Sequence, residues 1–131
     1  MANGTIAFDT LSTSGQISGT AVSVDTDYLA YGSAKAWANV NQTSSQAIRD
    51  SFNIASIVDG GTGATRSTFT SVMGNENYSV IATCTVLNSY NDNACAQEVT
   101  TSTYDVYCSN GANAANTDNP YAQSEIFGEL A

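Results

Sequence analysis

The fold is indicated most clearly by residues 51–70, which have the sequence SFNIASIVDGGTGATRSTFT. Residues 51–58 are rich in β-branched and aromatic side chains, and residues 65–70 alternate with the period of a strand. Residues 59–63, between them, supply the glycines that a tight turn with positive φ requires. A phosphate-binding loop would need a following lysine and a helical pattern, and this sequence has neither. The stretch therefore predicts a β-hairpin.

The composition of the whole chain agrees with an all-β fold. Its 131 residues include 12 Asp and Glu, 3 Lys and Arg and no histidine, which gives a formal charge of −9. Long amphipathic helices need charged outer faces, and charged residues make up only 11% of this chain. Ser, Thr, Asn and Gly favour turns and strand edges over helices. We expect one antiparallel β-sandwich of about seven strands.

Residues 34–40 have the alternation of another strand. The even positions are small or apolar, whereas the odd positions are Lys35, Trp37 and Asn39. The tryptophan therefore shares a face with polar neighbours, which indicates packing at a subunit boundary or a sheet boundary.

Two long strands are predicted in the second half of the chain. Residues 78–86 predict a central strand with Tyr78 and every second residue after it on one face. Residues 98–108 predict another, and because Val99 and Tyr104 fall in opposite registers we expect a bulge or a change of face. The other expected segments are strands at residues 5–9, 21–24 and 121–128, an acidic turn at 25–27, and loops at 11–20, 88–94 and 109–120.

Charge and composition exclude several classes of function. Three basic residues cannot neutralise a run of phosphates, which excludes nucleic acid and anionic membrane surfaces as partners. Without histidine there is no Ser-His or Cys-His catalysis and no His-containing zinc site. The N-terminus has neither a basic n-region nor an apolar h-region, so no secretory signal is expected. No apolar run approaches the ~20 residues of a membrane span.

The three cysteines are Cys84, Cys95 and Cys108. An odd number allows at most one intrachain disulfide, and synthesis in a reducing cytoplasm favours free thiols. Their spacing lacks the C-x₂-C unit of structural zinc sites, so we expect neither a metal nor a cofactor. Whether any two of them are oxidised is left open.

Carboxylates are numerous, but none has the context of a catalytic or metal site. A glycosidase would need two of them facing each other across a cleft, and no pair here has that setting, so we expect no enzyme. Asp25, Asp27 and Asp92 could offer oxygen ligands to Ca²⁺, but the spacing of an EF-hand loop is missing. Solvated acidic turns are the expected state.

The only cations are Lys35, Arg49 and Arg66. We expect each to pair with a carboxylate or to bond a carbonyl, with contact to a receptor as the alternative. Arg49 could also pin its turn to a neighbouring chain.

Tyr90, Tyr104, Tyr107 and Tyr121 fall in the late half of the chain, near the two long loops. Two interpretations are open for them. Their rings could cap the sandwich core, or they could stack on sugars and fill an interface at low entropic cost. Binding residues are expected in the long loops.

Several motifs, taken in order, resemble a module of tailed-phage virion proteins. In that module a G-S-A-K-A-W strand is followed by an A-I-R-x-S-F-N-V-x-S-I hairpin and a late N-Y strand. The corresponding segments here are GSAKAW at 32–37, AIRDSFNIASI at 47–57, DGGTG at 59–63, NYSV at 77–80 and IFGEL at 126–130. One departure is RSTF at 66–69, where the family more often has Y-T-V-N-F.

The resemblance covers residues 32–131 and implies a non-enzymatic, commonly trimeric domain at the end of a tail fibre. We therefore expect a homotrimeric phage tail-fibre or fibre-tip protein, made in the host cytoplasm and acting in host attachment through a surface receptor or glycan. Residues 1–31, which include Ile6, Phe8 and Leu11, are the expected attachment segment to other virion proteins. The alternative is a capsid decoration, cement or head-spike protein that stabilises the shell.

Overall fold

Strand β3 (Ala34–Asn41) shows why this sequence folds into two layers. Ala36, Ala38 and Val40 are buried on its inner side, whereas Trp37 lies on the outer side and is only half-buried. Small inner side chains allow a second sheet to pack closely against this strand. The alternation predicted from the sequence is confirmed. The structure is a computed structural model that describes residues 16–18, 23–85, 92–97, 99–111 and 114–131.

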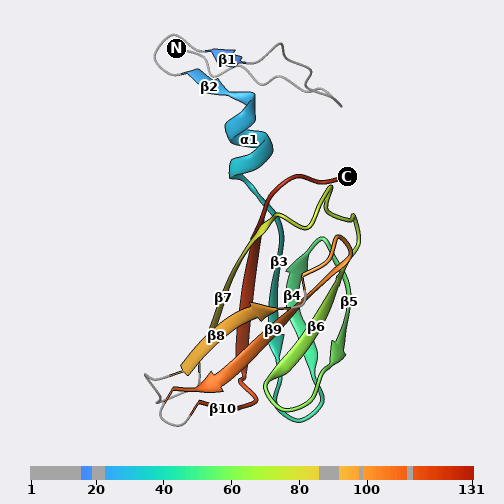
Figure 1. Cartoon of the computed structure of the whole chain (residues 1–131), viewed down its shortest axis with the longest axis vertical. Coiled ribbons are helices and arrows are strands. Elements are labelled where there is room, and N and C mark those ends of the chain that lie inside the picture. The colour runs from blue at the N-terminus through green and yellow to red at the C-terminus, as the bar shows by residue number, and fades with distance from the viewer. Residues whose placement is uncertain (1–15, 19–22, 86–91, 98, 112–113) are drawn as a thin grey trace, which may run out of the picture.

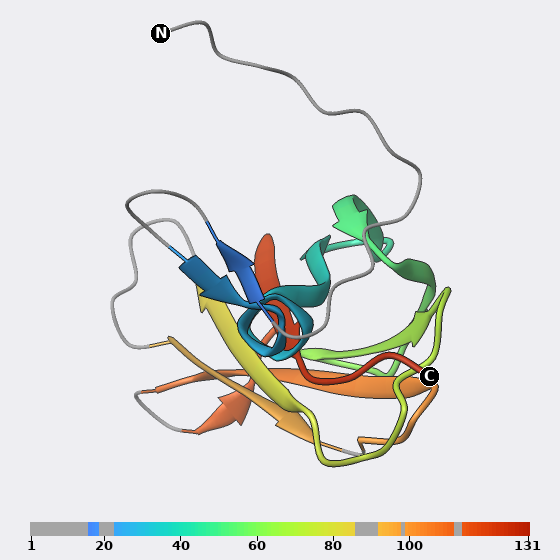
Figure 2. The ribbon, with the colours of Figure 1, turned by 90° about the horizontal axis from the view of Figure 1, so that it is seen from above.

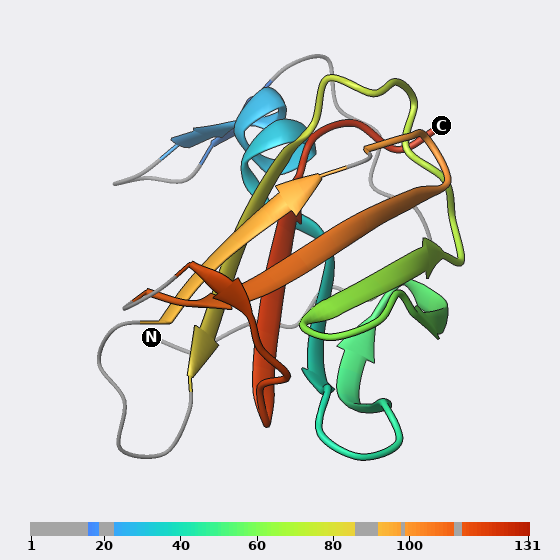
Figure 3. The same ribbon diagram turned by 60° about the horizontal axis from the view of Figure 1, so that its bottom comes forward.

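Two antiparallel sheets pack face to face as a β-sandwich (Figure 1). The four-stranded sheet has the order β4-β3-β11-β7, and the strands beside β3 are β4 (Ala47–Phe52), β11 (Tyr121–Phe127) and β7 (Ser79–Thr85). The five-stranded sheet has the order β10-β9-β6-β5, with β8 also paired to β9, and consists of β5 (Ile54–Asp59), β6 (Ala64–Phe69), β8 (Asp92–Gln97), β9 (Thr103–Asn110) and β10 (Ala115–Asn116). Figure 3 shows the strands of one sheet crossing those of the other. The predicted antiparallel β-sandwich is confirmed, but in the described part of the chain its sheets have four and five strands, which is more than the seven or so expected.

Asn53 carries the chain from one sheet to the other. The sequence predicts residues 51–58 as one β run, but the run bends at Asn53, which has φ 58° and separates β4 from β5. Its Nδ2 donates to the carbonyls of Lys35 (3.1 Å) and Ser71 (3.0 Å), and its Oδ1 accepts from the amide of Ser71 (2.7 Å). Asparagine tolerates this left-handed conformation better than most residues, and its amide holds the bend in place.

The hairpin predicted around residues 59–63 is confirmed as the β5–β6 turn. Gly61 has φ +100° and Gly63 has φ +70°, so two of the three glycines supply the left-handed positions. The carboxylate of Asp59 accepts from the Gly61 amide (2.8 Å), and that of Asp118 accepts from the Gly63 amide (2.6 Å). The turn is therefore capped by two carboxylates from separate parts of the chain.

The long strand predicted at residues 98–108 is wrong in its first part. The structure has a β8–β9 hairpin, in which residues 99–102 form the turn and β9 begins at Thr103. The Thr100 hydroxyl accepts from the amides of Ser102 (3.2 Å) and Thr103 (2.9 Å), a local bond that competes with strand pairing. The change of face read from Val99 and Tyr104 arises from this turn and not from a bulge.

The core lies between the two sheets and contains a cluster of three rings. Phe69 stacks on Tyr104 with ring centroids 5.3 Å apart and meets Tyr78 edge-on at 5.7 Å. The Tyr104 hydroxyl and the Ser124 hydroxyl are 2.7 Å apart, which joins β9 to β11 across the layers. Tyr78 donates to the carbonyls of Thr100 (2.8 Å) and Thr103 (3.1 Å) and so holds the β8–β9 turn.

The N-terminal elements stand at the end of the sandwich where β3 begins (Figures 1 and 2). They are β1 (Gln16–Ser18), β2 (Ser23–Asp25), which pairs with β1, and the helix α1 (Thr26–Gly32). Tyr28 and Tyr31 on α1 are exposed.

The acidic turn predicted at residues 25–27 is wrong, because these residues end β2 and begin α1. Asp25 precedes the helix and Gly32 ends it, and both residue types favour those positions. The strand expected at residues 5–9, together with Ile6, Phe8 and Leu11, lies outside the described residues.

The two expected loops are shorter than predicted where the structure describes them. Residues 88–91 of the first lie outside the described part, and residues 92–94 belong to β8. Within the second, expected at residues 109–120, Ser109 and Asn110 complete β9 and Ala115–Asn116 form β10. Strands β8 and β10 each pair with β9. These residues are therefore in strands although their composition favours turns.

Candidate binding face

The outer side of the four-stranded sheet presents two rows of side chains, which together we call the Trp37 face. Cross-strand pairing places Trp37 beside Phe52 and beside Glu125, and Glu125 beside Ile81. This first row is Phe52–Trp37–Glu125–Ile81. By the same registers the second row is Asp50–Asn39–Gln123–Thr83. The face therefore sets a row containing exposed apolar side chains beside a wholly polar row.

An open hollow of about 270 Å³ lies on this face, and we call it the Trp37 groove. It crosses β11 between β3 and β7, and its outward side chains are Trp37, Asn39, Ile81, Thr83, Gln123 and Glu125. These strands pair with one another along the groove, so its floor is held by backbone hydrogen bonds. A groove on a paired sheet keeps its side chains in fixed relative positions.

The polar groups of the Trp37 groove include both donors and acceptors: the Glu125 carboxylate only accepts, whereas the amides of Asn39 and Gln123 can do both. The Thr83 hydroxyl donates to Gln123 Oε1 at 3.4 Å. Asn39 Oδ1 is buried and has no hydrogen-bond partner within the described residues. Glu125 has no ion-pair partner in that part of the chain either. Because Asn39 Oδ1 is buried, the exposed Glu125 carboxylate is the stronger acceptor that this groove offers to a donor from outside the chain.

Arg49, the cation on β4, contacts Pro120 and Tyr121 of its own chain. Arg49 Nε donates to the Pro120 carbonyl (3.0 Å), and its guanidinium lies 4.6 Å from the centre of the Tyr121 ring. The expected pairing with a carbonyl is therefore confirmed. Lys35, which shares the outer side of β3 with Trp37, donates to the hydroxyl of Ser33 (2.5 Å).

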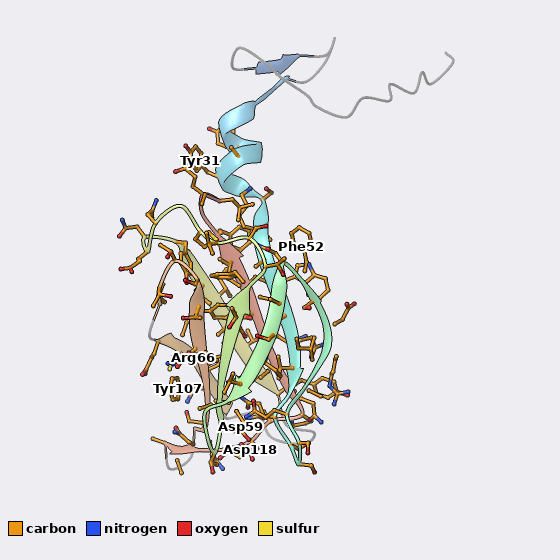
Figure 4. The ribbon with its side chains drawn as sticks, turned by 90° about the vertical axis from the view of Figure 1, so that its right-hand side faces the viewer. Tyr31, Phe52, Asp59, Arg66, Tyr107 and Asp118 are labelled. Carbon is orange, nitrogen blue, oxygen red and sulfur yellow. The ribbon has the colours of Figure 1, made fainter. Side chains whose placement is uncertain are left out.

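The opposite outer face, on the five-stranded sheet, carries an ion pair between Arg66 and Asp105. Arg66 Nε and Nη2 donate to the two carboxylate oxygens of Asp105 at 2.7 and 2.8 Å. The Asp105 side chain is only 8% exposed under the guanidinium, whose side chain is 44% exposed. Figure 4 shows Arg66 and Tyr107 on the side of the sandwich away from Phe52. The expected carboxylate partner of Arg66 is therefore confirmed.

The four late tyrosines do not form one site. Tyr104 is fully buried in the core, Tyr107 is half-buried on the Arg66 side, and Tyr121 is exposed beside Arg49. Tyr90 lies outside the described residues. Core packing is thus confirmed for Tyr104 alone.

Trp37 does not lie between the two sheets, which rules out the sheet-boundary interpretation. The alternation of residues 34–40 predicts the outward direction of Trp37 but not its neighbours on this face, Glu125 and Ile81, which lie far along the chain. The period-two patterns of residues 78–86 and 121–128 carry the signal for their direction. Only the strand order, with β11 between β3 and β7, brings the three side chains into one row.

Cysteines and carboxylates form no further centre in the described part of the chain. Cys84, Cys95 and Cys108 are half-buried, exposed and buried respectively, and no disulfide joins them within the described residues. Among the described residues no three Cys, Asp or Glu side chains gather as metal ligands. The side chains of Asp25, Asp27 and Asp92 lie outside the described part.

Asp59 and Asp118, which Figure 4 shows together at the end away from α1, are turn caps. No helix in the described part is both long and apolar enough to span a membrane. Comparisons of the chain with protein-family models, with curated proteins and with solved structures found no match.

Proposed function

We propose that this chain is a non-enzymatic virion protein of a tailed phage, a homotrimeric tail-fibre or fibre-tip component that acts in host attachment. The observation that carries the proposal is the Trp37 face. There the tryptophan of the GSAKAW segment is turned outward on a paired sheet, beside an exposed Phe52 and with an exposed Ile81 on the far side of Glu125. Exposed aromatic side chains on a fixed scaffold are typical of recognition surfaces.

The segments that resemble the phage module also occupy positions that this fold requires. Ala36 and Ala38 of GSAKAW make the inner side of β3, and Asn53 makes the bend between the sheets. Tyr78 of NYSV holds the β8–β9 turn. The resemblance and the packing therefore concern the same residues, which supports carrying the module's role to this chain.

We propose that the subunits of such a trimer meet at the α1 end. Tyr28 and Tyr31 of α1 are exposed, and so are Val72 and Leu130, which belong to the connections at that end. The amide of Ala131 bonds the Val72 carbonyl (3.1 Å), so the C-terminus closes on the same region (Figure 1). Contacts there would leave the Trp37 face free on each subunit, and residues 1–31 would attach the trimer to other virion proteins. Three weak sites on one trimer then act together.

Electron microscopy of phage particles labelled with an antibody against this protein tests the proposal. Label at the tail fibres or baseplate is expected. Label spread over the head would contradict host attachment and favour capsid decoration or a head spike. Sedimentation equilibrium of the purified chain tests the trimer, since three copies of the 13.6 kDa subunit are expected and a monomer would contradict it.

A further inference from the structure

We infer that the Trp37 groove binds a neutral or amino sugar, with one sugar ring lying on the indole and its hydroxyl or ammonium groups donating to Glu125 and Gln123. The inference rests on the proposed function, because a host-surface glycan is the receptor class it assigns to this groove. It moves the binding site away from the long loops and onto a sheet.

The indole of Trp37 provides the platform. Its strand is paired on both sides, to β4 and to β11, and Phe52 stands beside it across the strand. A fixed indole loses little entropy on binding, and its face is apolar while its N–H is polar. Sugar rings present an apolar patch of C–H groups, which packs on an aromatic face while the hydroxyls stay at the edge.

The acceptors around the platform call for a ligand that brings donors. The Glu125 carboxylate is exposed, has two oxygens and has no cation within the described residues. Gln123 Oε1 receives only a long bond from Thr83. A carboxylate and neighbouring amides can accept from adjacent hydroxyl groups, and bonds to a charged acceptor are the stronger ones. A polyhydroxylated ring supplies such donors on one edge.

Charge selects against anionic sugars. The chain carries a net charge of −9, and the groove lining contains Glu125 and no cation. Arg66 is held by Asp105 on the opposite face, and Arg49 is held by Pro120 and Tyr121 beyond the groove. Lys35, on the same outer side of β3 as Trp37, is not part of the groove lining and donates to the Ser33 hydroxyl. A sugar carboxylate would meet a like charge, whereas an ammonium group would meet an opposite one.

The size of the groove fits a single small ring. Its volume of about 270 Å³ lies just below the ~300–1,000 Å³ of pockets for drug-sized ligands. One ring on an open groove is expected to bind with a Kd on the order of 1 mM, and three copies on a trimer would raise the avidity.

Trp37 is the only tryptophan of the chain, so its fluorescence reports on this groove alone. We would titrate the full-length protein with methyl glycosides of glucose, galactose and mannose, with N-acetylglucosamine and glucosamine, and with N-acetylneuraminic acid as the anionic probe. A saturable change is expected with at least one neutral or amino sugar and none with N-acetylneuraminic acid. Side-chain amide NMR signals of Asn39 and Gln123 should shift in the same titration.

The variant Glu125→Gln keeps the shape of the side chain and is expected to bind the same sugar about tenfold more weakly, because it removes a charged acceptor. Tyr107→Phe, on the opposite face, is the matched control and should bind as the unaltered chain does. No fluorescence change with any neutral or amino sugar would overturn the inference, as would equal binding of N-acetylneuraminic acid. A fluorescence change on dilution of the protein alone would instead assign the groove to a second copy of the chain. Antibody label at the tail together with an unresponsive groove would leave the proposed function standing and reject only the sugar site.

Discussion

On the five-stranded sheet, Arg66 closes over Asp105 with two hydrogen bonds, and the carboxylate beneath it is nearly buried. On the four-stranded sheet, Glu125 lies between Trp37 and Ile81 and has no cation within the described residues. Both are outer faces of the same sandwich, yet among the described residues the carboxylate of the first face has a cationic partner and Glu125 on the second has none. Substitutions on the Arg66 side should therefore cost stability, and substitutions on the Trp37 face should cost binding instead.

The largest loss of unfolding free energy is expected for a substitution at Gly63, where the β5–β6 turn lies close to the backbone of Cys108 and Thr117. A Cβ there would lie 2.4 Å from the Cys108 carbonyl oxygen and 2.7 Å from the Thr117 amide nitrogen, and φ is +70°. These backbone atoms cannot rotate away, so Gly63→Ala should lose about 3–5 kcal/mol of unfolding free energy or fail to fold. Urea unfolding followed by circular dichroism measures the loss.

Gly61→Ala is the control for this first prediction. Gly61 also has positive φ, but a Cβ there would meet nothing within 4 Å. Its cost should be the backbone strain alone, about 1–2 kcal/mol. Equal losses in the two variants would show that strain, and not the close approach to β9 and residue 117, determines the effect.

These two glycines also show how much of the fold can be predicted from the sequence. The DGGTG segment predicts a turn, because its composition is local information. That Gly63 must face Cys108 and Thr117 depends on strands that lie about fifty residues away, so no local pattern contains it. The same limit applies to the Trp37 groove. The alternation predicts that Trp37 points outward, but only the strand order places Glu125 beside it and Ile81 next in the same row.

A second prediction concerns alkaline pH and the rings between the two faces. Burial, with smaller contributions from Tyr104 and Glu76, raises the pKa of Tyr78 from 10.0 to about 12, and burial raises the pKa of Tyr104 as well. The folded chain therefore favours neutral Tyr78, which contributes stability below pH 10 that is lost as the pH rises toward 12. The loss from Tyr78 should be about 2–3 kcal/mol.

Urea unfolding at several alkaline pH values, with tyrosinate absorbance in parallel, measures this loss. Tyr78→Phe should flatten the pH dependence and leave only the part due to Tyr104. At neutral pH it should cost about 1 kcal/mol, since the Thr100 carbonyl loses its bond from the phenol. An unchanged alkaline profile in this variant would contradict the assignment to Tyr78.

A third prediction compares two arginines on opposite faces. Arg66→Met leaves the nearly buried Asp105 carboxylate without its partner and should cost about 2–3 kcal/mol. Arg49→Met removes a bond to a carbonyl and a ring contact at an exposed site, and should cost about 1 kcal/mol or less. Thermal or urea unfolding separates the two. If Arg49→Met lost more unfolding free energy than Arg66→Met, the prediction that the Arg66 side contributes more to stability would be wrong.

The smallest effect on stability is expected on the Trp37 face itself, and a matched pair of isoleucines on neighbouring strands tests it. Ile81 is 52% exposed beside Glu125, whereas Ile126 on β11 is fully buried on the inner side. Ile126→Thr should cost about 2–3 kcal/mol, because it removes buried apolar surface and buries a hydroxyl. Ile81→Thr keeps a β-branched residue on the strand and should change the unfolding free energy by about 0.5 kcal/mol or less.

The same variant, Ile81→Thr, removes one apolar wall of the Trp37 groove, so it should weaken sugar binding while the protein stays as stable as before. If Ile81 contributes almost no stability to the fold, its side chain and that of Trp37 remain available for contact with another molecule. If Ile81→Thr instead unfolds the protein as readily as Ile126→Thr does, the Trp37 face supports the fold and the division between the two faces fails.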